Sequence, residues 1–174
     1  MDVLTAIASR RSLGRMKQDP VPRSLIEELL EAANWAPTHH RTEPWRFWVF
    51  SGEGRRQLSA VFAQLGEKEA AKPLRAPVVI AVGCRVQAAA DNVQEEICAS
   101  AAAVQNLLLA VEAKGLAGIW RSGAATYDER VRSFFGLEQQ DSLLGFIYLG
   151  YADPEAPQLP GRRGPVAEKT AWFE

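Results

Sequence analysis

Ala36-Pro37-Thr38-His39-His40-Arg41-Thr42-Glu43-Pro44-Trp45-Arg46-Phe47 holds both histidines of the chain, two arginines and a Pro-Trp step. It separates two apolar segments, because a helix is expected to stop before Pro37 and a strand to begin at Phe47. Polar and cationic loops held between regular elements commonly carry binding residues. This stretch therefore predicts a ligand-binding loop.

The paired histidines allow three interpretations: zinc ligation, general-base catalysis, or a hydrogen bond to a ligand. Adjacent side chains point in different directions and no third ligand follows at helical spacing, which argues against a metal. The chain has no Gly-x-Ser-x-Gly, and neither cysteine has the setting of a nucleophile. Ligand contact by at least one histidine is the favoured function, and a loop-stabilising role is the alternative.

A second cluster, Arg10-Arg11-Ser12, stands nearer the N-terminus. Guanidinium groups bind phosphate oxygens bidentately and a serine hydroxyl completes such a shell, so a phosphorylated cofactor is the natural partner. The alternative is that arginines near a helix end are merely solvated. The candidate donors are Arg10, Arg11, Ser12, His39, Arg41, Arg121, Ser122, Arg162 and Arg163.

Aromatic residues accompany these donors. Trp35, Trp45, Trp48 and Trp120 are expected near the same element ends, where they could border a planar ring. Core packing is the favoured role of Trp48, which lies mid-strand. No Gly-x-Gly-x-x-Gly follows a strand and no P-loop occurs, which excludes the usual dinucleotide and NTP sites.

Periodicity outlines the remaining elements. Small residues all round the segment 93–114 suit a central helix or a subunit interface. The apolar run 47–50 predicts a strand covered by helices on each side, and the Pro-rich tail from Tyr151 predicts an extended arm that lies on another surface. Helices are expected from an Asp2 cap to about Arg10, from Pro22 to before Pro37, from Gly54 through Leu65, over 93–114 and over 128–135, and strands over 47–50, 77–83, 117–120 and 143–150.

Composition limits the class of protein. A length of 174 residues with 47 % hydrophobic and 24 % charged residues suits one globular domain over 1–174, with an α/β unit as the default. A formal charge of −1 provides no global field for nucleic acid or an anionic membrane. No apolar run is expected to span a bilayer and no signal peptide is recognised, so a cytoplasmic location is expected. Cys84 and Cys98 are expected to be free, mostly buried thiols.

Five motifs occur in the order of a known family. They are Arg10-Arg11-Ser12, the stretch from Ala36 to Phe47, Gly118-Ile119-Trp120-Arg121-Ser122-Gly123, Gly145-Phe146-Ile147-Tyr148-Leu149-Gly150, and the Arg-Arg tail ending in Trp172-Phe173-Glu174. This ordered set resembles the nitroreductase family of flavoproteins, and most closely its short, single-domain bacterial branch.

The resemblance implies an α+β sandwich with a central mixed sheet flanked by helices, and a homodimer with a domain-swapped C-terminal arm. Two FMN molecules would lie at the subunit interface. NADH or NADPH would reduce the flavin, which would then reduce nitroaromatic, quinone or similar electrophilic acceptors in a two-step exchange. A non-catalytic flavin-binding or storage dimer is the alternative, and a structural dimer that binds no flavin is a third possibility.

The resemblance also implies roles for the candidate residues. Arg10 and Ser12, with Arg11 between them, would contact the phosphate and ribityl chain, and Arg163 with Arg162 would contact the phosphate. His39 and Trp35 would reach across from the partner subunit, and Trp120-Arg121-Ser122 would lie along the ring. Because the hydride chemistry belongs to the cofactor, no catalytic acid or base is expected.

Two departures from the family pattern concern the ring and the acceptor. Many relatives carry Asn and Gln where this chain has Arg41 and Glu43. Arg41 would add positive charge near the pyrimidine edge, whereas Glu43 would oppose an anionic flavin unless an arginine pairs with it. The segment from Gly66 to Ala76 is short, which predicts a shallow, open acceptor site with a wide range of acceptors.

Overall fold

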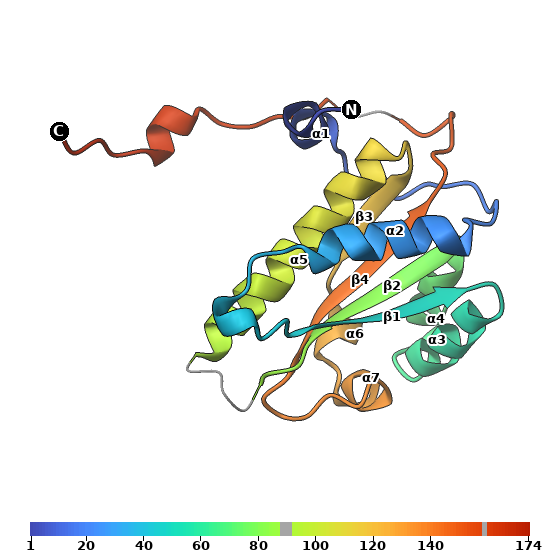
Figure 1. The fold of residues 1–174 in the computed structure, drawn as a ribbon. Coiled ribbons are helices and arrows are strands. Elements are labelled where there is room, and N and C mark those ends of the chain that lie inside the picture. The colour runs from blue at the N-terminus through green and yellow to red at the C-terminus, as the bar shows by residue number, and fades with distance from the viewer. Residues whose placement is uncertain (88–91, 158–159) are drawn as a thin grey trace.

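A computed structural model describes residues 1–87, 92–157 and 160–174. Its centre is a four-stranded sheet in the order β1-β2-β4-β3, with helices on both faces (Figure 1). Every pair of neighbouring strands runs antiparallel, so the expected mixed sheet is wrong. The strands are β1 Trp45–Ser51, β2 Val78–Cys84, β3 Ala117–Arg121 and β4 Ser142–Gly150.

Two connections explain the antiparallel sheet. The segment between β1 and β2 leaves and re-enters the sheet at the same end, because Ser51, the last residue of β1, pairs with Val78, the first residue of β2. The helix after β2 returns the chain so that β3 runs in the same direction as β2, but β4 pairs with both and separates them. Among the residues that the structure describes, one parallel bridge, Ser12 to Gly118, lies outside the named strands.

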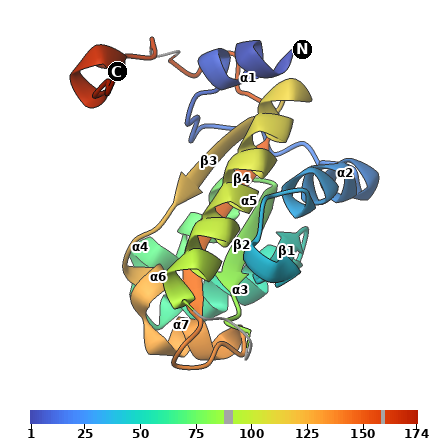
Figure 2. The same cartoon turned by 60° about the vertical axis from the view of Figure 1, so that its left-hand side comes forward.

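The faces of β2 divide the core into two parts. Val78, Ile80 and Val82 pack with the helices α2 and α5, whereas Val79 and Ala81 pack with α3 and α7. Side chains alternate across a strand, so a fully buried strand needs cover on both faces. The expected helix–sheet–helix sandwich is therefore confirmed (Figure 2). The helical elements are α1 Val3–Ser9, α2 Arg23–Asn34, η1 His39–Arg41, α3 Gly54–Ala63, α4 Glu67–Ala70, η2 Lys72–Arg75, α5 Val93–Ala113, α6 Ala124–Tyr127, α7 Glu129–Phe134 and η3 Val166–Lys169.

The first two helices start close to where their caps predict. Asp2 accepts a hydrogen bond from the backbone N–H of Thr5 at 3.0 Å and so caps α1, as expected. Pro22 stands one position before α2 rather than in its first turn. Local rules thus predict the first residue of both helices to within one position.

The burial of β1 differs from expectation. It pairs only with β2 and forms an edge of the sheet, and the Val49 side chain is exposed. The prediction of helices on each side is therefore wrong for part of this strand. Trp48 packs as predicted, with its ring centroid 4.9 Å from that of Phe135. Cys84 is buried, but Cys98 is exposed, contrary to expectation.

Helix α5 corrects the expectation about apolar runs. By length and composition it is the one helix among the described residues that could cross a membrane. Its face carrying Val104, Leu107 and Val111 nevertheless packs in the core with α2 and the sheet. Core helices of globular domains have the same composition, so packing explains its apolar character.

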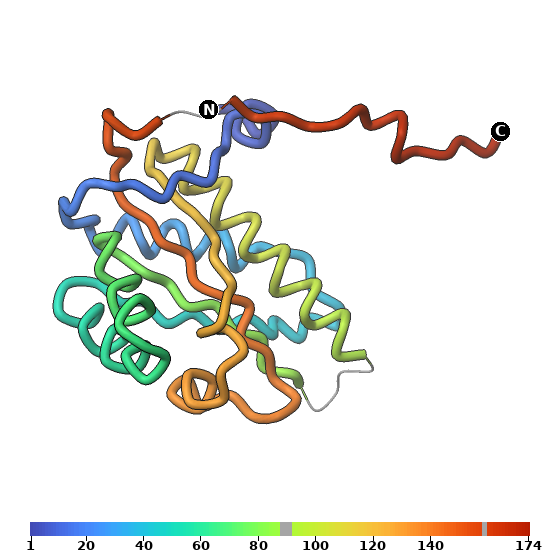
Figure 3. Tube along the Cα trace, turned by 180° about the vertical axis from the view of Figure 1, so that it is seen from behind, coloured from blue at the N-terminus to red at the C-terminus, as the bar shows by residue number. Residues whose placement is uncertain are grey.

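The C-terminal tail extends away from the body past α1 (Figures 1 and 3). Residues 160–174 are exposed throughout, with Trp172 and Phe173 at 83 % and 96 % exposure. The extended-arm prediction holds for this part, whereas residues 158 and 159 of the predicted arm lie outside the described residues. These two large aromatic side chains therefore have no packing surface within their own chain among the described residues.

Candidate functional site

After α1 the chain follows the free edge of β3. The backbone N–H of Leu13 donates to the carbonyl oxygen of Gly118 at 3.1 Å, next to the bridge between Ser12 and Gly118. Residues two apart in extended chain share a side, and Arg10 Nη1 lies 3.5 Å from Ser12 Oγ. The structure thus brings together two of the three donors predicted in this cluster.

Arg11, the third member, turns back on α1. Its Nη1 donates to the carbonyl oxygens of Ala8, Ser9 and Arg10 at 2.7, 2.8 and 3.0 Å. A cation at these unpaired carbonyls stabilises a helix C-terminus. Gly161 of the tail lies against the same side chain, since a Cβ there would be 2.6 Å from Arg11 Cζ. Arg11 therefore secures the helix end and the start of the arm.

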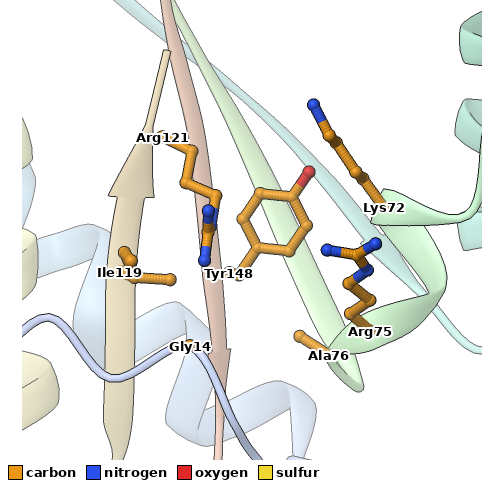
Figure 4. A pocket seen from close by; sticks show the side chains of 7 residues that line it. All are labelled: Gly14, Lys72, Arg75, Ala76, Ile119, Arg121 and Tyr148. Carbon is orange, nitrogen blue, oxygen red and sulfur yellow. The ribbon is translucent and has the colours of Figure 1, made fainter. Parts of the chain in front are cut away.

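Gly14, two residues after Ser12, lines a pocket near the end of β3. Figure 4 shows Lys72, Arg75 and Arg121 arranged around the ring of Tyr148. Four separate parts of the chain converge here: the N-terminal segment, η2, β3 and β4. The complete lining is Gly14, Lys72, Arg75, Ala76, Ile119, Arg121 and Tyr148.

Lys72, Arg75 and Tyr148 are not recognisable as site residues from the sequence pattern. Lys72 and Arg75 lie in the short segment before β2, which contains no recognisable motif. Tyr148 lies within the apolar run 143–150 and has the pattern of a core residue of a buried strand. Their proximity to Arg121 depends on long-range pairing of strands. The sequence feature that could have indicated them is the presence of two cationic residues, Lys72 and Arg75, just before the predicted strand 77–83.

The pocket carries excess positive charge. Lys72 Nζ lies 2.5 Å from Glu69 Oε1, but Arg75 and Arg121 form no ion pair with a carboxylate in the described part of the chain. Burial raises the pKa of Tyr148 to about 12, although Arg121 and Arg75 act in the opposite direction. The phenol therefore stays protonated at neutral pH, and the pocket is suited to an anionic or electron-rich ligand.

A second hollow adjoins the first at Arg121. It shares Lys72, Arg121 and Tyr148 with the first and adds Ser122 and Gly123. Trp120 precedes this turn, and its Nε1 donates to the carbonyl oxygen of Leu144 at 3.0 Å. The predicted group 120–122 thus lies at the pocket's edge, with the indole tied to the neighbouring strand.

The loop around η1 has an unusual backbone. His40, Arg41 and Glu43 have positive φ angles of 49°, 56° and 46°. For residues other than glycine this conformation costs of order 1–3 kcal/mol each and persists where surrounding contacts impose it. The Arg41 side chain is exposed, and the carbonyl oxygen of Glu43 accepts a hydrogen bond from Arg46.

His39 faces the first turns of α5. Its Nε2 lies 3.7 Å from Glu95 Oε2 across an open hollow of about 390 Å³ that Cys98 also lines. Trp35, before the loop, is 79 % exposed, and its Nε1 donates to Glu31. Trp45 is buried with its Nε1 on Asn34, so the expected cluster of tryptophans does not form within one chain.

The two predicted clusters lie at opposite ends of α5. Ser9 Oγ donates to Glu112 Oε1 at 2.7 Å near the helix C-terminus, whereas His39 meets Glu95 in its first turn. Seventeen residues at 1.5 Å each separate these two glutamates by about 26 Å. The loop and the cluster around Arg10 therefore cannot contact one small ligand within a single chain.

The tail arginines begin beside the first cluster. Arg162 and Arg163 follow Gly161, which lies against Arg11. Both side chains are exposed, and Arg163 Nη1 donates to the carbonyl oxygen of Arg162. They add positive charge on the α1 side of the molecule.

Known proteins are similar to this chain in sequence and in architecture. The model of the nitroreductase family matches residues 7–151. The Escherichia coli K12 protein named "Putative NAD(P)H nitroreductase YdjA" is 36 % identical over 171 residues, covering 91 % of this chain and 90 % of its own length.

Two solved structures match this chain over nearly their whole length. A "Nitroreductase-like Family Protein" from Bacillus cereus has a TM-score of 0.89 and 29 % identity, covering 100 % of this chain and 97 % of its own. A "putative nitroreductase in complex with fmn" from Desulfovibrio desulfuricans has a TM-score of 0.82 and 27 % identity, covering 100 % and 98 %. The chain therefore belongs to the nitroreductase family of oxidoreductases, as its ordered motifs indicate.

Proposed function

We propose that this protein is an FMN-dependent oxidoreductase in which NADH or NADPH reduces the flavin, which then reduces nitroaromatic, quinone or similar electrophilic acceptors. The observation that carries the proposal is the row of guanidinium and hydroxyl donors along the free edge of β3. It runs from Arg10 and Ser12 beside Gly118 to Gly14 beside Arg121. A relative in complex with FMN supports the identity of the cofactor.

The donors fit the two ends of FMN. Arg10 and Ser12 form a guanidinium–hydroxyl pair suited to a phosphate. From Ser12 to Gly14 the extended chain advances about 7 Å, and there the guanidiniums of Arg75 and Arg121 lack carboxylate partners among the described residues. Unpaired cations at this position favour a ligand with an electron-rich ring edge.

The side chains of the pocket supply charge and hydrogen bonds. Bound FMN would supply the hydride-transfer chemistry itself. Arg121, Lys72 and Arg75 would stabilise negative charge on a ligand beside them, and the protonated Tyr148 phenol would donate a hydrogen bond. Fixed donors of this kind need no proton transfer from the protein, so we assign no catalytic acid or base.

A second copy of the chain would complete the site. The loop with His39, Arg41 and Trp35 is too far along α5 to reach the ligand of its own subunit, so it would act on the partner's ligand. The exposed arm, with Trp172 and Phe173 in water, would cover the partner. A homodimer with a swapped arm is therefore part of the proposal, as is one FMN-binding domain over 1–174.

The assembly is tested by truncating the chain after Gly161. Loss of the arm is expected to give a monomer in light scattering and to weaken flavin retention, because Arg162 and Arg163 are removed with the aromatic anchors. A truncated chain that stays dimeric and keeps its flavin would contradict the swapped arm.

The acceptor side is proposed to be open. Between Gly66 and Ala76 the chain forms only the four-residue helix α4 and the single turn η2. Short elements leave little material to enclose an acceptor, so we expect many acceptors to react with high KM values. Tight selectivity for one acceptor would contradict this expectation.

The decisive experiment separates the enzyme from a flavin-storage protein. The purified protein is first examined by absorption spectroscopy, and any flavin is extracted and identified. Anaerobic mixing with NADH and with NADPH is then followed at the flavin absorption maximum. Rapid bleaching with either nucleotide supports the enzyme, bleaching with neither supports storage, and colourless protein without affinity for FMN would refute both.

A further inference from the structure

The loop from Thr38 to Glu43 is attached to α5 through a buried carboxylate. Thr42 Oγ1 donates to Glu96 Oε1 at 2.5 Å, and Glu96 is only 2 % exposed. No lysine or arginine pairs with Glu96 in the described part of the chain. A buried carboxylate without a cation is costly, and here one oxygen, Oε2, has no hydrogen-bond partner among the described residues, so the single hydrogen bond from the loop to Oε1 requires an explanation.

The contacts form a directed chain of hydrogen bonds. The Thr42 hydroxyl has one hydrogen and two acceptors within reach, Glu96 Oε1 at 2.5 Å and the carbonyl oxygen of His39 at 3.1 Å. The shorter contact is the one to Glu96, and with its hydrogen on that carboxylate Thr42 accepts from Thr38, whose Oγ1 lies 3.0 Å away. Thr38 Oγ1 in turn accepts from the backbone N–H of Glu43 at 3.2 Å. Hydrogen bonds in series polarise one another, and one that ends on a carboxylate is stronger than a neutral bond.

This series of hydrogen bonds spans the strained part of the loop. Its two backbone ends, Thr38 and Glu43, enclose the left-handed residues His40 and Arg41. Left-handed residues persist where surrounding contacts over-determine them. The contacts from Glu96 through Thr42 to Thr38 are such a restraint, since they tie both ends of the loop to the rigid helix.

We propose that Glu96 is a positioning residue that, through Thr42, holds His39 and Arg41 in the geometry needed to contact the flavin of the partner subunit. This inference rests on the proposed function. Glu96 itself touches no ligand, because its carboxylate is buried between α5 and the loop. Its role is to fix the backbone that presents these two side chains.

The test compares three substitutions in the full-length protein. Thr42→Val keeps the volume but removes the hydroxyl, Thr42→Ser retains the hydroxyl, and Ser100→Ala is the matched control. Ser100 lies one helical turn from Glu96 on α5 and is fully buried, and none of its hydrogen bonds among the described residues goes to Thr38, Thr42 or Glu96. Ser100→Ala therefore removes a buried hydroxyl near Glu96 without breaking the chain of hydrogen bonds.

Two measurements follow the loop without using flavin. They are hydrogen exchange at the Glu43 amide and the rate of tryptic cleavage after Arg41, both on the apoprotein. Thr42→Val is expected to increase both, whereas Thr42→Ser and Ser100→Ala stay near wild type. Unchanged exchange and cleavage in Thr42→Val would overturn the proposal.

A third measurement tests the functional consequence. Loss of one hydrogen bond to a charged group is expected to weaken FMN binding about tenfold in Thr42→Val, with recovery in Thr42→Ser. A loosened loop with unchanged FMN affinity would overturn the positioning role. If wild-type protein binds no FMN, the proposed function fails, yet the exchange and cleavage measurements still decide whether the Thr42 hydroxyl, which links Glu96 to Thr38, restrains the loop.

Discussion

Replacing Gly14 with alanine should separate ligand binding from folding. The added Cβ would lie 2.8 Å from Arg121 Nη2, while its next neighbour, Ile119 Cδ1, is 3.9 Å away. To reach a contact of 3.4 Å the guanidinium must retreat by about 0.6 Å, the difference between 3.4 and 2.8 Å. Only the end of one flexible side chain has to move, so the damage is confined to the position of Arg121.

The expected effect on stability is small because two contributions oppose each other. An off-rotamer arginine costs about 0.5–1.5 kcal/mol, and alanine stabilises by about 0.4–1 kcal/mol because it restricts the unfolded chain. The second contribution applies because the φ of Gly14 lies outside the left-handed range. The melting temperature of the apoprotein should therefore change by less than about 4 °C.

The expected effect on FMN binding is large. A hydrogen bond between an ionised guanidinium and a ligand contributes about 1.5–3 kcal/mol, so its loss should weaken binding about ten- to hundredfold. Gly54→Ala is the control, because that position has no atom within 4 Å and no left-handed φ. The assays are thermal melting of apoprotein and fluorescence titration with FMN.

Two outcomes would refute the reasoning. A fall in melting temperature of more than about 8 °C would mean that Gly14 supports the fold rather than the site. FMN affinity equal to that of Gly54→Ala would mean that the position of Arg121 does not affect the ligand.

Three further predictions concern a donor, a turn and a phenol. Arg10→Ala should weaken FMN retention more than the control Arg56→Ala, because the Arg56 guanidinium pairs with a surface glutamate away from the site. Equal retention of FMN by the two variants after gel filtration would count against the phosphate role of Arg10. Gly145→Ala should cost at least about 2–4 kcal/mol in urea unfolding, because its φ is +133° and a Cβ would lie 2.5 Å from a backbone oxygen; wild-type stability would contradict this. The folded pKa of Tyr148, about 12, exceeds the usual 10, so its stabilising contribution is complete below pH 10 and is lost as pH rises towards 12. Wild type should therefore lose about 2 kcal/mol more than Tyr148→Phe across that window, and parallel losses in urea titrations would exclude the effect.

Local chemistry made much of the fold predictable. Asp2 caps α1, the apolar run before Cys84 forms β2, and the alanine-rich segment forms α5. Capping and periodicity act over a few residues, so neighbouring sequence carries the information. The family could be identified for a related reason, because its motifs occur in order along the chain.

Long-range pairing decided the rest. That β4 inserts between β2 and β3, and so makes the sheet antiparallel, depends on contacts that no short motif encodes. The same pairing brings Tyr148 and Arg121 together and allows Lys72 and Arg75, from an inconspicuous segment, to join them.

The separation of the two cationic clusters also required the tertiary structure. The sequence marks Arg10 and His39 as donors through their residue types and neighbours, but it cannot specify the distance between them. That distance is set by α5, whose 21 residues hold the two groups at opposite ends. Residue chemistry therefore indicated which ligand the donors suit, whereas the rigid helix determined that one chain cannot gather them around it.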